Sequence, residues 1–243
     1  MKRQEGGPTK RQMDLPLPMP GEAEAKAAQA LMAFLLRLRA RGISDVSVLR
    51  AIETTPRELF VPHRYRDLAL RDMALPIPCG QTMPEAWLVA RMMEALDLKP
   101  GHRVLEIGAG SGYATAVAAR LAGEVVSCEI FEPLAVECAE RLARLGLANV
   151  KIMRGDAFAL LPSLGLFDRV LIHGTVEGLP PALLECLAQD GVIVMARKSA
   201  GRAATLVRIA HQPTGDFIQN NLCPCRLGAR PDQGAKSAGA EVV

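Results

Sequence analysis

Three glycines at alternate positions, Gly108, Gly110 and Gly112, follow an apolar run that contains one carboxylate, Glu106. Glycine lets the chain turn sharply and lie against a ligand because it carries no Cβ. A helical pattern from Ala114 to Ala122 follows the turn, and the start of such a helix offers free N–H groups to a nucleotide-type ligand. The run therefore predicts a strand, a glycine turn and a helix that bind a small molecule.

The residues around this turn narrow the choice of ligand. A dinucleotide-binding turn needs a third glycine at the place of Tyr113, so that class is disfavoured. Glu106 would repel a pyrophosphate but would tolerate a cation. Glu129 ends the next predicted strand, where an acid can accept hydrogen bonds from two ribose hydroxyls. Asp156 and Ala157 follow a third strand, and we expect Asp156 to accept from the amine of an adenine.

Glycines followed by acids at the ends of successive strands resemble the S-adenosylmethionine (AdoMet) site of Rossmann-like methyltransferases. A glycine turn alone is often only a structural turn, whereas glycines followed by two acids at successive strand ends are strong evidence for such a site. The resemblance implies AdoMet as methyl donor, S-adenosylhomocysteine as product and no metal. The expected cofactor-binding residues are Gln81, Thr82, Met83, Glu106, Gly108, Ala109, Gly110, Gly112, Glu129, Asp156 and Ala157.

Bulk properties restrict the class of protein further. The chain has 243 residues, 49% of them apolar, and a net charge of +3. No long Lys/Arg run is present and aromatic residues are only 4%, which argues against a nucleic-acid partner. Six scattered cysteines favour a reduced, cytoplasmic protein, and Cys223 and Cys225 lack further ligands for a metal. No apolar run is long enough for a membrane span or a signal peptide.

Strand and helix patterns alternate after Arg103, which predicts an α/β fold with a mostly parallel sheet and helices on both faces. The expected strands are 103–107, 124–128, 149–153, 168–172 and 191–195, with a further strand at 204–210 and a candidate start at Phe217-Ile218. The expected helices are 112–122, 132–145, 157–163 and 180–188.

The chain divides into four predicted segments. They are a disordered tail (1–22), a helical extension with a segment that covers the substrate and cofactor (23–98), the AdoMet-binding methyltransferase domain (99–229) and a flexible tail (230–243). Within the extension, helices are expected at 23–41, 46–53 and 84–96, and residues 56–84 form a proline-rich loop region draped on the main domain. Ser44 or Asp45 is expected to cap the second helix.

Motifs before the glycine turn, together with the turn itself, resemble the protein-L-isoaspartate (D-aspartate) O-methyltransferase family, which carries PRE-FVP, LPI, GQTIS and VLEIGTGSGY in this order. The matching stretches are Pro56–Pro62, Ala74–Ile77, Gly80–Met83 and Val104–Tyr113. The similarity extends from about Gly42 to Ala210. It implies an AdoMet-dependent carboxyl O-methyltransferase that acts on L-isoaspartyl residues of damaged proteins.

Two departures from the family bear on activity. The family has an active-site serine after GQTI, whereas this chain has Pro84, which offers neither a hydroxyl nor an N–H. A C-terminal strand that holds the substrate peptide in the family corresponds to residues 225–229 here. The substrate carboxylate is ionised near neutral pH, so no general base is needed. The lost serine is therefore an orienting donor, and Thr82 with the amides of 81–83 are the candidates to replace it.

Other functions stay open at the level of the sequence. One is a carboxyl methyltransferase of a different peptide or natural product, and another is a non-catalytic AdoMet-binding protein. A nucleic-acid methyltransferase is disfavoured because residues 171–175 lack an Asn/Asp-Pro-Pro-aromatic motif. His173 ends the fourth strand and is expected to line the site rather than to act as a base. The hydroxyl of Thr82 has a purely structural alternative, as a turn group bonded to local backbone.

Overall fold

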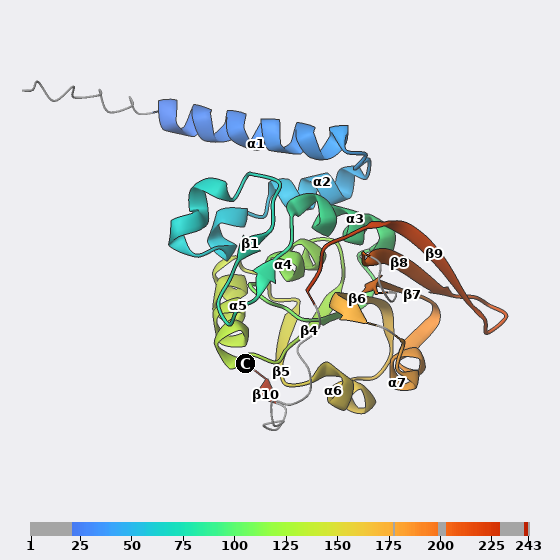
Figure 1. Ribbon diagram of the computed structural model, residues 1–243. Coiled ribbons are helices and arrows are strands. Elements are labelled where there is room, and N and C mark those ends of the chain that lie inside the picture. The colour runs from blue at the N-terminus through green and yellow to red at the C-terminus, as the bar shows by residue number, and fades with distance from the viewer. Residues whose placement is uncertain (1–20, 177, 199–202, 229–240, 243) are drawn as a thin grey trace, which may run out of the picture.

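A single mixed sheet forms the centre of the molecule. The computed structural model describes residues 21–176, 178–198, 203–228 and 241–242. Within them the sheet has the order β10-β5-β4-β3-β6-β7-β8-β9 (Figure 1). Its strands are β3 (Arg103–Ile107), β4 (Glu124–Glu129), β5 (Val150–Arg154), β6 (Phe167–Val176), β7 (Leu187–Arg197), β8 (Thr205–His211), β9 (Phe217–Pro224) and β10 (Glu241–Val242).

The central strands β5, β4, β3, β6 and β7 run parallel, while β8, β9 and β10 are antiparallel to their neighbours. The mostly parallel sheet is thus confirmed, and Phe217 does begin a strand. Because the strands are parallel, their carboxyl ends meet at one edge of the sheet, where ligands bind in such folds. Strand β10 lies in the stretch predicted as a flexible tail, of which residues 230–240 and 243 lie outside the described part of the chain.

Helices cover both faces of the sheet, as predicted. Buried side chains of α3 (Ala86–Leu96), α4 (Tyr113–Ala119) and α5 (Glu132–Arg144) pack on one face. Those of α6 (Ala157–Leu164) and α7 (Pro181–Glu185) pack on the other. Helix α7 is shorter than predicted because the buried Leu187 already pairs with Phe167 as the first residue of β7.

The N-terminal extension forms a separate layer over the α3 and α4 face. Helix α1 (Glu22–Ala40) lies outermost, with only Phe34 and Leu38 of its described residues fully buried, and α2 (Val46–Glu53) lies beneath it (Figure 1). The Asp45 carboxylate caps α2 by accepting from the amides of Ser47 and Val48 at 2.7 and 3.1 Å. Asp45, rather than Ser44, is therefore the cap.

Residues 56–84 are ordered by short elements rather than by long helices. Two 3₁₀ helices, η1 (Arg57–Phe60) and η2 (His63–Leu68), precede a two-stranded antiparallel hairpin of β1 (Leu75–Pro76) and β2 (Thr82–Met83). We call residues 75–84 the covering segment. It leads directly into helix α3, so its position is tied to the main core.

One buried arginine fixes the covering segment in place. The guanidinium of Arg57 donates to the carbonyls of Ala69, Arg71, Met73 and Pro84 at 2.6, 3.2, 3.1 and 2.9 Å. A rigid fork with five donors is suited to gathering several carbonyls at one point. The Arg57 of the sequence motif is therefore structural: it ties the η2 loop and the start of α3 to η1.

Candidate active site

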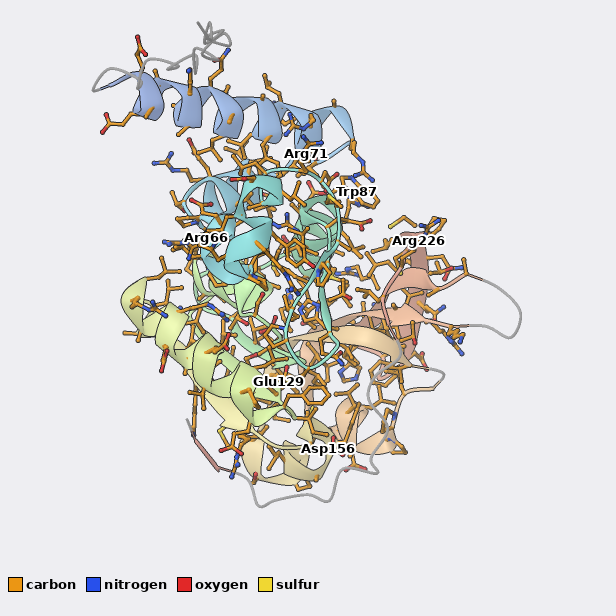
Figure 2. The ribbon with its side chains drawn as sticks, turned by 60° about the vertical axis from the view of Figure 1, so that its left-hand side comes forward. Arg66, Arg71, Trp87, Glu129, Asp156 and Arg226 are labelled. Atoms are coloured by element: carbon orange, nitrogen blue, oxygen red, sulfur yellow. The ribbon has the colours of Figure 1, made fainter. Side chains whose placement is uncertain are left out.

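A cavity of about 270 Å³ opens at the carboxyl edge of the parallel strands. It lies where the covering segment, the glycine turn and the ends of β4, β5 and β6 meet, and Figure 2 shows Glu129 and Asp156 from neighbouring strands at this edge. Residues that line it include 80–84, 107–111, 128–131, 155–157, 173–174 and 227–228. The predicted site residues are thereby brought together, with the exception of Glu106 and Gly112, which are not among the described residues that line the cavity.

The glycine turn is built from left-handed backbone. Gly108, Gly110 and Gly112 have φ values of 94°, 57° and 91°, which are strained for residues with a Cβ. A Cβ at Gly112 would lie 2.7 Å from the sulfur of Cys138 on α5. The amide of Gly108 donates to the carbonyl of Cys128 at 2.8 Å, which anchors the turn to the end of β4. The turn therefore needs glycine both for its conformation and for its close packing.

Glu129, at the end of β4, is buried next to this turn. Its two carboxylate oxygens accept from the amides of Gly110 at 2.8 Å and Phe131 at 2.9 Å. Burial raises the pKa of Glu129, while the amides of Phe131, Gly110 and Ile130 act in the opposite direction. A carboxylate offers about four acceptor positions, so Glu129 retains capacity for hydroxyl donors of a ligand.

Asp156 and Ala157 stand one strand further along the sheet. Asp156 is the N-cap of α6, and its carboxylate accepts from the amide of Phe158 at 3.1 Å. The amide of Gly155 donates to the backbone carbonyl of Glu129 at 2.9 Å, which holds the ends of β4 and β5 together. Two acids thus line one cavity from neighbouring strands, as the sequence predicted.

Glu106 occupies a different position from the one expected. It is fully buried and is not among the described residues that line the cavity. One carboxylate oxygen accepts from the hydroxyls of Thr115 at 2.5 Å and Ser127 at 2.6 Å, and the other lies 2.9 Å from Nε2 of His173. The reason is the alternation of side chains along β3, which turns this carboxylate toward α4 instead of the open edge. Its link to the cavity is His173, which does line it.

The covering segment supplies one wall of the cavity. Gln81, Thr82, Met83 and Pro84 all line it, with Thr82 exposed and Met83 buried. The amide of Ile77 donates to the carbonyl of Gln81 at 2.9 Å, which closes the hairpin. The covering segment and the glycine turn therefore line the same cavity, whereas no pattern in the sequence had indicated the hairpin.

Cys128, at the end of β4, is also among the residues that line the cavity, although its side chain is buried in the core. Burial raises the pKa of Cys128 to about 12, so the thiol stays protonated near neutral pH and is a poor nucleophile.

Among the described residues, no group of three or more His, Cys, Asp or Glu could hold a metal ion. No helix of the described chain is long and apolar enough to cross a membrane.

Comparison with known proteins assigns the chain to a family. The family model described as protein-L-isoaspartate(D-aspartate) O-methyltransferase matches residues 28–228. The chain belongs to this family. Among curated protein-L-isoaspartate O-methyltransferases, one from Rhodopseudomonas palustris strain HaA2 is 47% identical over 196 residues, covering 81% of this chain and 90% of the relative. Another, from Bradyrhizobium sp. strain ORS 278, is 46% identical over 197 residues, covering 81% and 91%.

Solved structures agree with this assignment at the level of the fold. A chain from Plasmodium falciparum described as a protein-L-isoaspartate O-methyltransferase, solved with S-adenosyl-L-homocysteine, superposes with a TM-score of 0.72 at 24% identity. The match covers 81% of this chain and 96% of that one. The predicted fold class and the resemblance to the protein-L-isoaspartate O-methyltransferase family are therefore confirmed.

The anchoring role of Arg57 could not be predicted from the sequence. Arg57 carries part of the family motif, yet its role as an anchor depends on four carbonyls that are distant along the chain. Leu227 and Gly228 complete the cavity wall, and the carbonyl of Gly228 accepts from the amide of Thr175 at 2.9 Å. No local pattern marks the role of Arg57, whereas the resemblance to the family had pointed to residues 225–229.

Proposed function

We propose that this protein is an AdoMet-dependent methyltransferase that esterifies the free carboxylate of L-isoaspartyl residues in proteins, with an orienting donor missing at Pro84. Family membership supports the reaction and the substrate class. The observation that carries the proposal is the cavity itself, because a glycine turn, Glu129 and Asp156 meet there under the covering segment.

The residues present fit the adenosyl group of AdoMet. Glu129 has acceptor capacity for the ribose hydroxyls, and Asp156, with the adjoining Ala157, is placed for the adenine amine. The turn at Gly108 to Gly112 lets the backbone lie close to the ligand because no Cβ intervenes. When bound, AdoMet would supply a methyl group on a sulfonium for transfer to the substrate carboxylate, with S-adenosylhomocysteine as the leaving group.

This chain's own contribution to the reaction is position and the exclusion of water. The carboxylate of the substrate is already ionised, so no base has to remove a proton. Holding the two reactants in line accounts for most of the rate in such a reaction. Thr82 and the amides of 82 and 83 are the donors we assign to the carboxylate, because the amide of Gln81 already donates to the carbonyl of Pro78 at 3.2 Å. Pro84 lines the same wall without a side-chain or backbone donor.

The ribose assignment predicts a measurable loss of affinity in a Glu129→Ala variant. Removing a charged acceptor of two hydroxyls should weaken binding of S-adenosylhomocysteine by at least ~1–2 kcal/mol in titration calorimetry. Glu140→Ala serves as the matched control, because Glu140 is a solvent-exposed acid on α5. Equal affinity of wild type and the Glu129 variant would remove Glu129 from the site.

The covering segment is predicted to become protected when the cofactor product binds. Its wall residues Gln81 to Met83 lie at the cavity, so a ligand there should slow exchange of their amide hydrogens. Mass-resolved hydrogen exchange with and without S-adenosylhomocysteine measures this. Residues 46–53 of α2, which do not line the cavity, are the internal reference. Protection confined to residues 106–113 would make the segment a linker.

The reaction is tested by transfer of a labelled methyl from AdoMet to an isoaspartyl peptide and to its aspartyl counterpart. We expect methylation of the isoaspartyl peptide alone. Pro84→Ser should raise this rate by roughly 10- to 100-fold, the value of ~1–3 kcal/mol for one orienting donor. Pro78→Ser, at an exposed proline of the same segment that does not line the cavity, should leave the rate unchanged.

Two outcomes of the same assay would redirect the proposal. Methylation of both peptides alike, or of neither, contradicts isoaspartyl specificity. If neither peptide is methylated but S-adenosylhomocysteine still binds, the presence of Pro84 in place of the family serine favours a different methyl acceptor. That acceptor would be a carboxylate on another peptide or on a small molecule.

A further inference from the structure

His173 is the one imidazole among the described residues that line the cavity. It lies near the carboxyl end of β6, and 12% of its side chain is exposed. Its Nε2 is 2.9 Å from a carboxylate oxygen of Glu106. The mechanism above assigns no role to this pair, although it connects a buried charge to the active-site cavity.

The partners of Glu106 determine which nitrogen of His173 carries the proton. Hydroxyls of Thr115 and Ser127 occupy one oxygen of Glu106, and the ring lies at the other. An ionised carboxylate only accepts, so Nε2 must be the donor. In the neutral ring Nδ1 is then an acceptor. This atom is buried and has no hydrogen-bond partner among the described residues, and an unsatisfied buried group of this kind calls for an explanation such as an absent ligand.

The order of the strands indicates which part of the ligand lies near His173. The sheet runs β5-β4-β3-β6, with Asp156 after β5, Glu129 at the end of β4 and the glycine turn after β3. In AdoMet the adenine, ribose, sulfur and amino-acid group follow one another in a single chain. If adenine and ribose lie at Asp156 and Glu129, the amino-acid end reaches β6. A Cβ at Gly108 would lie 3.3 Å from Cβ of His173, so the imidazole flanks the turn.

We propose that Nδ1 of His173 accepts a hydrogen bond from the α-ammonium group of AdoMet and of its product, with Glu106 acting through the ring. The inference rests on the proposed function, because it takes the adenosyl assignments as given. The carboxyl group of Glu106 lies directly behind the ring, and no Lys or Arg is among the described lining residues. This charge balance suits a cationic ammonium and disfavours the anionic carboxylate of the substrate at the same atom.

The test compares two ligands by titration calorimetry. S-adenosylhomocysteine carries the amino-acid group, whereas 5′-methylthioadenosine lacks it and retains adenine, ribose and sulfur. His173→Phe keeps a ring but removes both nitrogens. We expect it to weaken binding of S-adenosylhomocysteine by about 5- to 30-fold and to leave binding of 5′-methylthioadenosine unchanged. Equal losses for both ligands, or no loss for either, would overturn the proposal.

Two further variants separate cofactor binding from support of Glu106. His173→Asn retains an acceptor near the position of Nδ1, whereas His173→Gln retains a donor near the position of Nε2. We expect Asn to recover most of the lost selectivity for S-adenosylhomocysteine and Gln to recover little. The reverse order would make His173 a structural partner of Glu106 only.

A deaminated S-adenosylhomocysteine that keeps its carboxylate gives an independent readout. Wild type should bind it more weakly than S-adenosylhomocysteine, and His173→Phe should bind the two ligands alike. A wild type that does not distinguish them would contradict the ammonium contact. These measurements need no peptide substrate, so they succeed or fail separately from isoaspartyl methylation.

Discussion

Replacing Arg57 by alanine is expected to lower the free energy of unfolding by about 3–5 kcal/mol, because it empties a buried site and strands several acceptors. The side chain is 1% exposed and donates to four carbonyls. Its guanidinium also lies 5.5 Å from the ring centroid of Tyr113, which lines the cavity. Loss of Arg57 should therefore also loosen the covering segment and reduce affinity for S-adenosylhomocysteine. Urea unfolding monitored by circular dichroism measures the first effect.

Two control variants test whether the loss of stability comes from the guanidinium of Arg57. Arg57→Lys keeps the charge but has three donors on one nitrogen instead of a planar fork, so it should recover only part of the stability. Arg64→Ala removes an exposed arginine of η2 and should change stability by less than about 0.5 kcal/mol. A loss below about 1 kcal/mol for Arg57→Ala would show that water satisfies the carbonyls equally well.

The second large effect is expected from Gly112→Ala. The left-handed backbone, with φ of 91°, costs a Cβ-bearing residue about 1–2 kcal/mol, and the new Cβ would lie 2.7 Å from the sulfur of Cys138. We expect a total loss of about 2–4 kcal/mol in unfolding free energy. Because relief of the clash must move the glycine turn, affinity for S-adenosylhomocysteine should fall by more than about tenfold. Chemical denaturation and calorimetry follow the two quantities.

The strain and the clash at Gly112 are separable. Gly146→Ala introduces a Cβ at a φ of 68° with nothing within 4 Å, so it reports conformational strain alone. Adding Cys138→Ala to Gly112→Ala removes the sulfur and should restore part of the cofactor affinity. If the double variant binds no better than the single one, the backbone conformation accounts for the whole effect.

Much of the site could be predicted because it depends on local spacing. The glycine turn and the two acids Glu129 and Asp156 follow successive apolar runs, and parallel strands bring such ends to one edge. Glu106 shows the limit of this reasoning. Its place beside the glycine turn suggested that Glu106 contacts a ligand. Whether its side chain reaches the cavity depends on which face of β3 it occupies and on its partners from α4, β4 and β6.

The covering segment could be predicted only in outline. Its prolines indicated a loop. They concealed the hairpin because β1 consists of only Leu75 and Pro76, and so short a strand shows no alternating pattern in the sequence. Cys79 in the turn adopts a φ of 59°, which is uncommon for a residue with a Cβ. Helix α7 was overestimated for a related reason: Leu187 continues a helical pattern in sequence, while its burial in the sheet decides its structure.

The cavity draws its walls from residues as far apart as Ile77 and Gly228, and this has a consequence for biosynthesis. During translation the glycine turn, Glu129 and Asp156 leave the ribosome well before Leu227. A nascent chain at that stage holds the acids and the turn without the last wall, so it should release AdoMet readily to solvent. AdoMet is therefore expected to bind and stabilise the complete protein, and to contribute little to the early steps of its folding.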